Sequence, residues 1–521
     1  MSGNVFRYLR VRALLKSCIA IALLFLGAAI VQPARADSKN NVLTIGVTAE
    51  PYTLDPALGL SGNDYPYLYT IFDRLLTFDP KTLEPRPGLA ESWEFTGADK
   101  LTFRFKLRPN LKFQDGTALD ADAVKESLVH FQGSGRIHDL DVVKSIDVVD
   151  PLTIELHLTR QFSPLTAVLA DRAGMISSPT AIKKYGKDYD RHPVGAGPFM
   201  LKQWNAASSL ELTAFPDYWD KSRIKLNGVT FKIIANGTSL ISAALTGQVD
   251  YAYNLESKSL AALQASPRIR VSAEPSLQYN MINVNDGYAP MDNALVRRAV
   301  AMSIDRNALA EISLGGAKGE GTTSLPVPPS SFASDPRYAD YYKYDPAKAK
   351  ELLAQAGFPN GVTLKICANP SSTGMGTDMT DVERETMKAV GINLDVVVLT
   401  GSACVQAFNL RHEFPIWQGG FSGRPHPYMT FEAYFGSSGA YNKTHVKFPG
   451  VDELLDRIAS TYSTEEQKPL FAELDRLWIE QMPIVPLFFR PNLSVYSKSV
   501  AGEIPNAQGK PDPTSLYFVD R

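Results

Sequence analysis

The chain has 521 residues and a formal net charge of −2, and 21% of its residues are charged. This near-neutral balance excludes a basic nucleic-acid-binding protein. One hydrophobic core stops growing near ~250–300 residues, so a chain of this length is expected to form at least two lobes.

The first 36 residues have the pattern of a secretory signal peptide. Arg7, Arg10 and Arg12 form a basic start, residues 17–31 are apolar, and Ala34-Arg35-Ala36 matches a small-residue cleavage site. We predict cleavage after Ala36 and an exported, periplasmic protein. The alternative is an uncleaved N-terminal anchor. No later apolar run is long enough to span a membrane.

Two segments of the first half alternate strictly between apolar and polar residues. They are 101–107 (LTFRFKL) and 153–158 (TIELHL). This period of two predicts half-buried antiparallel strands. His157 falls on the polar side of its strand and is expected at the surface, not as a ligand. The segment from 79 to 194 is rich in such strands and in turns.

The region from about 290 to 480 has the pattern of an α/β unit. Residues 345–357 predict a helix that is capped by Asp345 and ends at Gly357. Residues 361–366 and 394–399 predict parallel neighbouring strands that a helix through 382–390 joins. The apolar run 394–399 is expected to be buried on both faces. A last strand is expected at 484–489.

No enzyme motif is complete in this sequence. Residues 420–424 (GFSGR) lack the final glycine of G-x-S-x-G, and the glycine-rich stretch 315–323 lacks the G-K-[S/T] ending of a phosphate loop. The seven histidines form no pair with metal-ligand spacing. We therefore predict no catalytic residues, no metal site and no cofactor.

Two cysteines, Cys367 and Cys404, remain after the predicted cleavage site. An exported compartment permits a disulfide bond between them. Spacing alone does not fix the geometry, so the bonded and the free forms both stay open.

Many segments together resemble the oligopeptide-, dipeptide- and nickel-type extracytoplasmic solute-binding proteins of ABC importers, known as family 5. The similarity covers nearly the whole chain after residue 36, and the order and spacing of the segments match. The matching segments include TLDPA (53–57), LEPRPGLAESWEF (83–95), FQDGTALDADAVK (113–125), GAGPFMLKQW (195–204), NALVRRAVAMSIDRNAL (293–309) and DPAKAKELLAQAGFPNG (345–361).

The resemblance implies an α/β fold of two lobes that are joined by a hinge, with an additional α+β subdomain inserted in the first lobe. On this basis we expect lobe I at 37–283 with the insertion at about 79–194, lobe II at 284–486, and a C-terminal return to lobe I at 487–521. The lobes close on a small-molecule solute by hinge motion. The protein then delivers the solute to inner-membrane permease subunits, as a monomer and without covalent chemistry.

The loop that follows residue 421 is the most informative departure from the family. Peptide-binding members carry an aspartate there, in a pattern like Y-P-D-P-D, which holds the ammonium of the ligand. This chain reads Arg424-Pro425-His426-Pro427-Tyr428, and its next carboxylate is Glu432. Because an arginine repels an ammonium and suits a carboxylate or phosphate, we expect a small anionic solute.

One option for this solute is an opine or sugar phosphodiester of the agrocinopine type. The alternative within the same class is a di- or oligopeptide, including glutathione-like ones, whose ammonium is held by an unidentified acid. An exported hydrolase is a third reading, against which the missing motifs argue.

The candidate ligand-binding residues come from five loops or strand ends. Three of these residues also have a structural role as an alternative to ligand contact. Arg424 could brace its own loop, and His426 could face the solvent. Arg172 could pair with Asp171 or support its loop. The candidates are Trp417, Gly419, Gly420, Phe421, Ser422, Arg424, His426, Ser371, Ser372, Asn63, Tyr65, Asn280, Asn283 and Arg172.

Overall fold

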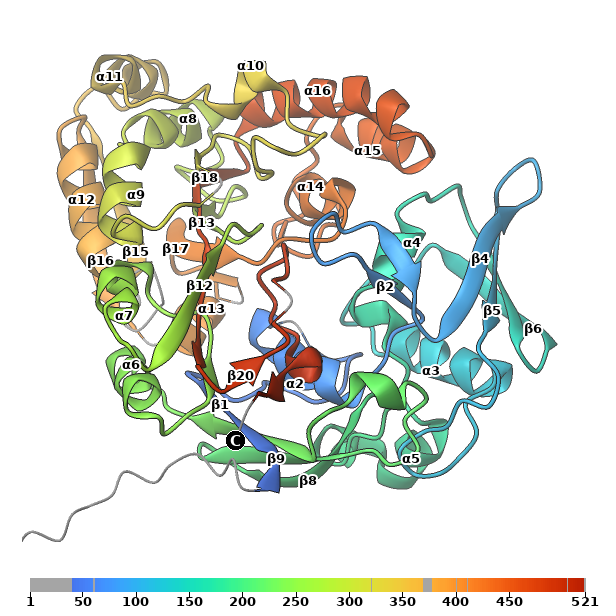
Figure 1. Cartoon of the computed structure of the whole chain (residues 1–521). Helices are drawn as coiled ribbons and strands as arrows, with labels where there is room; N and C mark the ends of the chain where they lie inside the picture. Colours follow the sequence, from blue (N-terminus) through green and yellow to red (C-terminus); the bar gives the residue numbers. More distant parts are fainter. Residues whose placement is uncertain are drawn as a thin grey trace, which may run out of the picture.

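The computed structural model describes residues 40–59, 61–319, 321–368, 377–399, 401–409, 411–503 and 505–519. The predicted signal peptide lies outside them. Two large sheets, each covered by helices, form two lobes, and a smaller sheet forms a subdomain beside them (Figure 1). Within the part of the chain that is described, no helix combines the length and the apolar character that a membrane span requires.

A seven-stranded sheet organises the first lobe. Its core strand β1 pairs in parallel with β10 and β11, and helices α6 (Gly237–Thr246) and α7 (Leu260–Gln264) pack against it. The strand order is β12 (Ile269–Glu274), β19 (Asn492–Ser497), β11 (Tyr251–Ala252), β1 (Val42–Val47), β10 (Gly228–Ile233), β9 (Ser209–Ala214) and β8 (Phe199–Asn205).

A six-stranded sheet organises the second lobe. The helices around it are α8 (Ala294–Met302), α9 (Arg306–Leu314), α11 (Pro346–Gln355), α12 (Thr377–Lys388) and α13 (Gly401–Asn409). The strand order is β14 (Gly321–Thr322), β18 (Ile484–Phe489), β13 (Tyr279–Val284), β17 (Ile416–Phe421), β15 (Val362–Ala368) and β16 (Ile392–Val398).

The local predictions for this lobe are confirmed except in one respect. Asp345 caps α11 by accepting from the backbone N–H of Lys348, and β15 pairs in parallel with β16. The expectation that 394–399 is buried on both faces is wrong. Strand β16 is the last strand of its sheet, and Val398 is 56% exposed.

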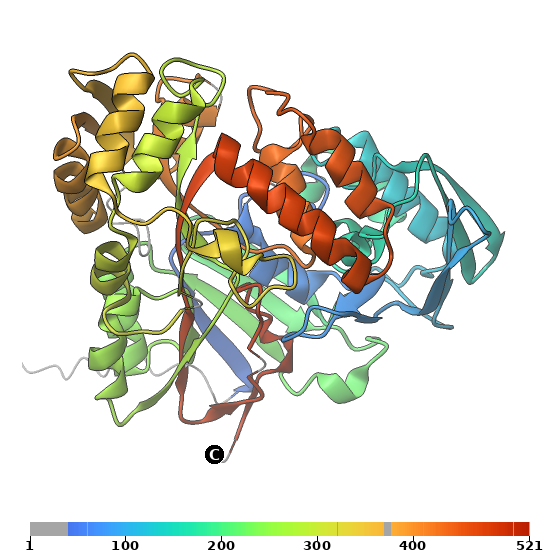
Figure 2. The same ribbon diagram turned by 90° about the horizontal axis from the view of Figure 1, so that it is seen from above.

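Three further helices, α14 (Pro427–Phe435), α15 (Val451–Ala459) and α16 (Thr464–Gln481), complete the second lobe. Figure 2 shows α16 and α15 in red and orange-red beside the blue and cyan part of the chain. The backbone N–H of Ser163, which precedes α4 (Leu165–Leu169) of the blue and cyan part, donates a hydrogen bond to the carbonyl of Ala459 on α15 at 2.7 Å. The second lobe therefore packs directly against the smaller sheet's subdomain.

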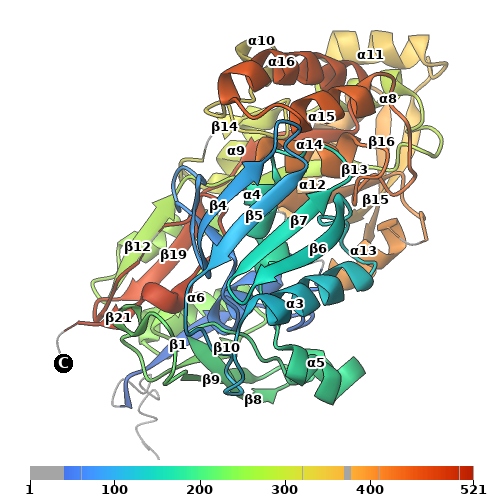
Figure 3. The same ribbon diagram turned by 90° about the vertical axis from the view of Figure 1, so that its right-hand side faces the viewer.

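That subdomain is a four-stranded antiparallel sheet with helix α3 (Ala121–Gly133) beside it (Figure 3). The two segments with alternating residues form its central strands. The strand order is β4 (Ala90–Thr96), β5 (Thr102–Leu107), β7 (Thr153–Leu158) and β6 (Val143–Asp150). The side chain of His157 is 34% exposed and contacts Thr102 and Asp147, in agreement with a surface position.

The chain passes between the two large sheets twice. It leaves β12 for β13 through residues 275–278, and it returns from β18 to β19 through 490–491. Both connections are short, and Arg490 N–H donates to the Gln278 carbonyl at 2.9 Å between them. This arrangement suits a hinge. The predicted lobe boundaries remain predictions.

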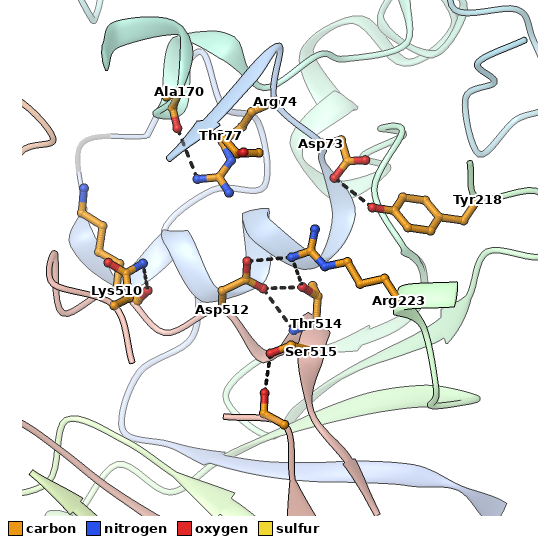
Figure 4. A network of polar contacts seen from close by, with 12 residues as sticks. Asp73, Arg74, Thr77, Ala170, Tyr218, Arg223, Lys510, Asp512, Thr514 and Ser515 are labelled. Carbon is orange, nitrogen blue, oxygen red and sulfur yellow. Dashed lines mark hydrogen bonds and ion pairs between the residues drawn. The ribbon is translucent and has the colours of Figure 1, made fainter. Parts of the chain in front are cut away.

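After β19 the chain runs back along the first lobe. Strand β20 (Val500–Ala501) pairs with β21 (Tyr517–Phe518), and Arg223 binds Asp512 at 3.3 Å and Thr514 at 2.7 Å (Figure 4). Asn506 donates to the carbonyl of Lys510 at 3.0 Å. These bonds fix the segment 505–515 and place Lys510 at the boundary between the lobes.

Candidate functional site

The two lobes meet where the loop after β17 faces two loops of the first lobe. An added Cβ on Gly62 would lie 3.2 Å from Ser422 Oγ, so the loops are in close contact. Helix α2 (Tyr65–Ile71) begins beside this contact, and Asp171 and Arg172 follow helix α4 (Leu165–Leu169). Charged side chains from four distant parts of the sequence gather here.

Asp171 lies at the centre of this cluster. Its Oδ2 is 3.5 Å from Lys510 Nζ and 3.7 Å from Arg424 Nη1. The side chains of Asp171 and Lys510 are each 2% exposed, while that of Arg424 is 22% exposed. The C-terminal segment, the first lobe and the second lobe therefore each supply one charge to a single buried network.

The pKa values follow from this arrangement. Burial alone would raise the pKa of Asp171, but Lys510, Arg424 and Arg172 hold it below its usual value. Burial lowers the pKa of Lys510 to about 7, although Asp171 opposes the shift. Burial also disfavours the charged form of Arg424, yet neighbouring acidic groups raise its pKa above the usual value.

Arg172 takes a bracing position in the first lobe. Its Nη1 lies 3.6 Å from Asp64 Oδ2, and its Nη2 donates to the Ser61 carbonyl at 2.9 Å. Its guanidinium lies 4.4 Å from the centre of the Tyr65 ring. The carboxylate that pairs with Arg172 is therefore Asp64. The ion pair with Asp171, which the sequence analysis offered as an alternative, does not form, whereas support of the loop does.

The side chain of Tyr65 contacts all three cations of the network, Arg172, Arg424 and Lys510. Its ring lies 3.8 Å from Lys510 Nζ and its hydroxyl 3.5 Å from Arg424 Nη1, in addition to the Arg172 contact. The contacts with Arg172 and Lys510 are cation–π interactions, and the contact with Arg424 is a long hydrogen bond. Of the three cations, Arg424 has the most exposed side chain.

His426 turns into the second lobe. Its Nδ1 accepts from the backbone N–H of Tyr428 at 3.2 Å and so caps helix α14. The ring lies 5.9 Å from that of Phe332 and 6.4 Å from that of Phe471. Burial lowers its pKa to about 4, so this imidazole stays neutral near pH 7.

Strands β13 and β17 bring several other candidates together. Asn283 pairs with Trp417 and donates to its carbonyl at 3.4 Å, while Asn280 pairs with Gly420. A Cβ on Gly419 would overlap the Asn283 side chain, so the close approach needs glycine here. The Trp417 ring packs against Phe408 at 5.7 Å.

The remaining candidates are dispersed. Phe421 is 5% exposed and packs on Tyr279, Tyr434 and Tyr441. Asn63 is exposed on a short helical turn. Ser371 and Ser372 lie outside the described residues. Nearby, the end of β15 is joined to α13 by a disulfide bond between Cys367 and Cys404, whose Cα atoms are 5.9 Å apart.

Sequence reasoning missed Asp64 and Lys510, and it considered Asp171 only as a partner of Arg172. The only available signal was the absence of a carboxylate in the loop 423–430. That absence implied that any acid at the site comes from another segment, but no local pattern shows which.

Comparison with known proteins identifies the class. Residues 84–442 match the family model described as "Bacterial extracellular solute-binding proteins, family 5 Middle". The chain belongs to this family. It is the extracytoplasmic solute-binding component of an ABC importer, which captures a small-molecule ligand and delivers it to the permease.

Several relatives extend over almost the whole chain. The glutathione-binding protein GsiB of Escherichia coli K12 is 28% identical over 495 residues, which cover 89% of this chain and 92% of GsiB. Among solved structures, AgaA from A. tumefaciens R10 in complex with agropinic acid has a TM-score of 0.83 at 22% identity and covers 92% of this chain and 99% of its own.

Two further structures have comparable similarity. MoaA from A. tumefaciens R10 in complex with mannopinic acid has a TM-score of 0.80 at 25% identity, with 92% of this chain and all of MoaA covered. DppA from Helicobacter pylori in complex with the peptide STSA has a TM-score of 0.82 at 22% identity, with 92% and 98% covered. The fold class expected from the sequence, a two-lobed α/β binding protein, is confirmed. The relatives are binding proteins and not enzymes.

Proposed function

We propose that this protein is exported to the periplasm by its first 36 residues and captures a small polar solute with an acidic group between its lobes. Arg424 holds the acidic group, and the protein passes the solute to the permease without covalent chemistry. The observation that carries this proposal is the position of Arg424, a cation on the second lobe that faces buried charges of the first.

The exposure of Arg424 supports an anionic group. Lys510 and Asp171 are both almost fully buried and pair with each other, and Arg172 pairs with Asp64 in the first lobe. Arg424 has the most exposed side chain of the three cations, at 22%, and its Nη1 lies 3.7 Å from Asp171, which is longer than a hydrogen bond. Its guanidinium is therefore the donor that we propose for the acidic group of the solute. An arginine fork binds a carboxylate or phosphate with two parallel hydrogen bonds.

The relatives support the same group. The solutes that are named for AgaA and MoaA are agropinic acid and mannopinic acid, and both are acids by name. We therefore favour an opine-like or sugar-phosphate-like solute. The residues proposed to line its site are those of the loop 420–424 with Tyr65, Arg172 and the β13–β17 pair.

A peptide is the second candidate. The glutathione-binding relative and the peptide complex of DppA favour it. A peptide requires an acid for its ammonium, and no carboxylate lies in the loop that supplies one in peptide-binding members of the family.

The test is calorimetric binding of a panel made of agropinic acid, mannopinic acid, glutathione and the dipeptide Met-Leu. We expect Arg424→Ala to weaken binding at least 10-fold, because a charged hydrogen bond contributes ~1.5–3 kcal/mol. Arg411→Ala is the matched control, since Arg411 is exposed on the second lobe and pairs only with Glu413 in the described structure. Equal affinity of wild type and Arg424→Ala for the bound members would contradict the proposal.

A further inference from the structure

One buried carboxylate oxygen of the first lobe lies between two cations. Lys510 Nζ, from the C-terminal segment, is 3.5 Å from Asp171 Oδ2, and Arg424 Nη1, from the second lobe, is 3.7 Å from the same oxygen. The side chains of Asp171 and Lys510 are each 2% exposed. Two positive charges therefore share Asp171, and only one of them belongs to the loop that is proposed to bind the solute.

This sharing decides how firmly Asp171 holds Arg424. Opposite charges attract more strongly in a protein interior than in water, because the surroundings screen them less. Lys510 compensates Asp171 at the shorter of the two distances. Arg172, the remaining cation of the network, pairs with Asp64 at 3.6 Å. Without the ammonium of Lys510, Arg424 would become the main counter-charge of Asp171 and would be less available to an acidic group from outside the network.

Residues of the hinge hold Lys510 in place. Gln278, which directly precedes β13, donates from Nε2 to the Gly509 carbonyl at 2.5 Å, and the backbone N–H of Leu277 donates to the Ala507 carbonyl at 2.6 Å. Gly509 has a φ of +67°, and an added Cβ there would lie 2.6 Å from the Gln278 side chain. The residue next to Lys510 thus fits against the hinge only as glycine.

The turn that carries Lys510 is also fixed by its own side chains. Asn506 Oδ1 accepts from the backbone N–H of Gln508 at 2.8 Å, and Asn506 Nδ2 donates to the Lys510 carbonyl at 3.0 Å. Gln508 is fully buried, and its Oε1 lies 3.5 Å from the Tyr69 hydroxyl of the first lobe. Because the turn is bonded both to the hinge and to the first lobe, the ammonium has a fixed position beside Asp171.

We propose that Lys510 sets the affinity of the site for an acidic group by compensating Asp171, which leaves Arg424 available to the solute. Gln278 is a positioning residue that acts through Lys510 and ties the ammonium to the hinge. This inference rests on the proposed function of Arg424. Loss of Lys510 weakens the binding of an acid in two ways, because the uncompensated Asp171 repels the acid and also competes with it for Arg424.

The binding experiment compares acids with their uncharged forms. The probes are agropinic acid and Met-Leu, each beside its carboxamide, and the acid preference is the ratio of the two dissociation constants. We expect Lys510→Met to reduce the acid preference at least 10-fold and Asp171→Asn to increase it. The double variant Asp171→Asn/Lys510→Met should regain at least the preference of wild type. Lys498→Met, which replaces an exposed lysine between β19 and β20, is the control and should keep it.

The outcomes separate this inference from the proposed function. Equal loss of acid and amide affinity in Lys510→Met shows that Lys510 supports only the fold, and the inference is overturned. A double variant that stays as weak as Lys510→Met shows that Lys510 contacts the acid itself, which also overturns compensation through Asp171. An unchanged acid preference in Arg424→Ala contradicts the proposed function instead.

A double-mutant cycle tests the positioning role of Gln278. Gln278→Leu removes the bond to Gly509 at nearly constant volume, and it should lower the acid preference when Lys510 is present. In the Lys510→Met background the same substitution should leave the acid preference unchanged, because the residue through which it acts is gone. Equal effects in both backgrounds overturn this role. Gln355→Leu, on the exposed surface of α11, is the matched control.

A stability cycle tests the sharing of Asp171 without any solute. Arg424→Ala should lower the melting temperature more in the Lys510→Met background than in wild type, because Arg424 is then the main counter-charge of Asp171. The Lys498→Met background should give the same shift as wild type. If Arg424→Ala has the same effect in all three backgrounds, Lys510 and Arg424 do not share Asp171, and the inference is overturned.

Discussion

Asp171 and Lys510 form a buried ion pair, 3.5 Å between Oδ2 and Nζ, although 339 positions separate them in the sequence. Each side chain is 2% exposed. A buried pair is strongly destabilised when one partner is removed, because the other charge stays desolvated. This single contact therefore couples the C-terminal segment to the lobe boundary and to Arg424.

Replacement of Asp171 by asparagine should lower the free energy of unfolding by about 3–5 kcal/mol, since Lys510 then lacks its counter-charge. Urea unfolding measures the change. The double variant Asp171→Asn/Lys510→Met removes both charges and should recover a large part of the loss. An unchanged urea midpoint for Asp171→Asn alone would show that the pair contributes nothing.

The pH dependence of stability should report on Glu383. This residue of α12 is fully buried, accepts from Gln418 Nε2 at 3.0 Å, and has its pKa raised to about 8 by burial. A raised folded-state pKa gives stability that is complete below the unfolded value of 4.5 and is lost as the pH rises through about 8. We expect Glu383→Gln to raise the melting temperature at pH 9 and to have a smaller effect at pH 5.

The control for this prediction is Glu385→Gln on the same helix, whose side chain is exposed. Its melting temperature should follow that of wild type at both pH values. If Glu383→Gln shifts the melting temperature equally at pH 5 and pH 9, ionisation of Glu383 does not contribute.

Gly59 should be intolerant of a side chain. An added Cβ would overlap Arg172 Nη1 and lie 2.8 Å from Asp64 Oδ2. Gly59→Ala therefore displaces the Arg172–Asp64 pair, and it should cost about 1–3 kcal/mol of stability. Gly133→Ala is the matched control, because a Cβ there meets nothing within 4 Å. Thermal unfolding of both variants gives the comparison.

The Cys367–Cys404 bond should stabilise the second lobe by about 2–4 kcal/mol, from the restriction of the unfolded chain. Reducing agent should lower the urea midpoint of wild type. The double variant Cys367→Ser/Cys404→Ser should begin at the lower midpoint and should not respond to reductant. If reductant also lowers the urea midpoint of the double variant, the destabilisation of wild type by reductant does not come from this disulfide bond.

Local sequence patterns predicted the helices and strands well, because the residues that determine each element lie within or next to it. Alternation at 101–107 and the cap at Asp345 depend on residues within one or two turns of the chain. The expected double burial of 394–399 was wrong because a strand's place in its sheet is set by the other strands. A run of valines does not distinguish an edge strand from a central one.

The site was predictable only in part for a similar reason. Arg424 and Tyr65 were candidates because they lie in segments that resemble those of the family. Lys510 was not, since it reaches the lobe boundary only through the packing of the C-terminal segment. The preference for an anion followed from a loop that lacks aspartate, whereas the contacts of Asp171 with Lys510 and Arg424 became visible only once three distant segments were in place.

The position of Lys510 makes the charged network a readout of the whole fold. Asp171, Arg424 and Lys510 come from three distant segments of the chain, and their charges meet only when the first lobe, the second lobe and the segment 505–515 are packed together. A substitution that loosens any one of these three parts therefore disturbs the network as well, even when it lies far from the boundary between the lobes.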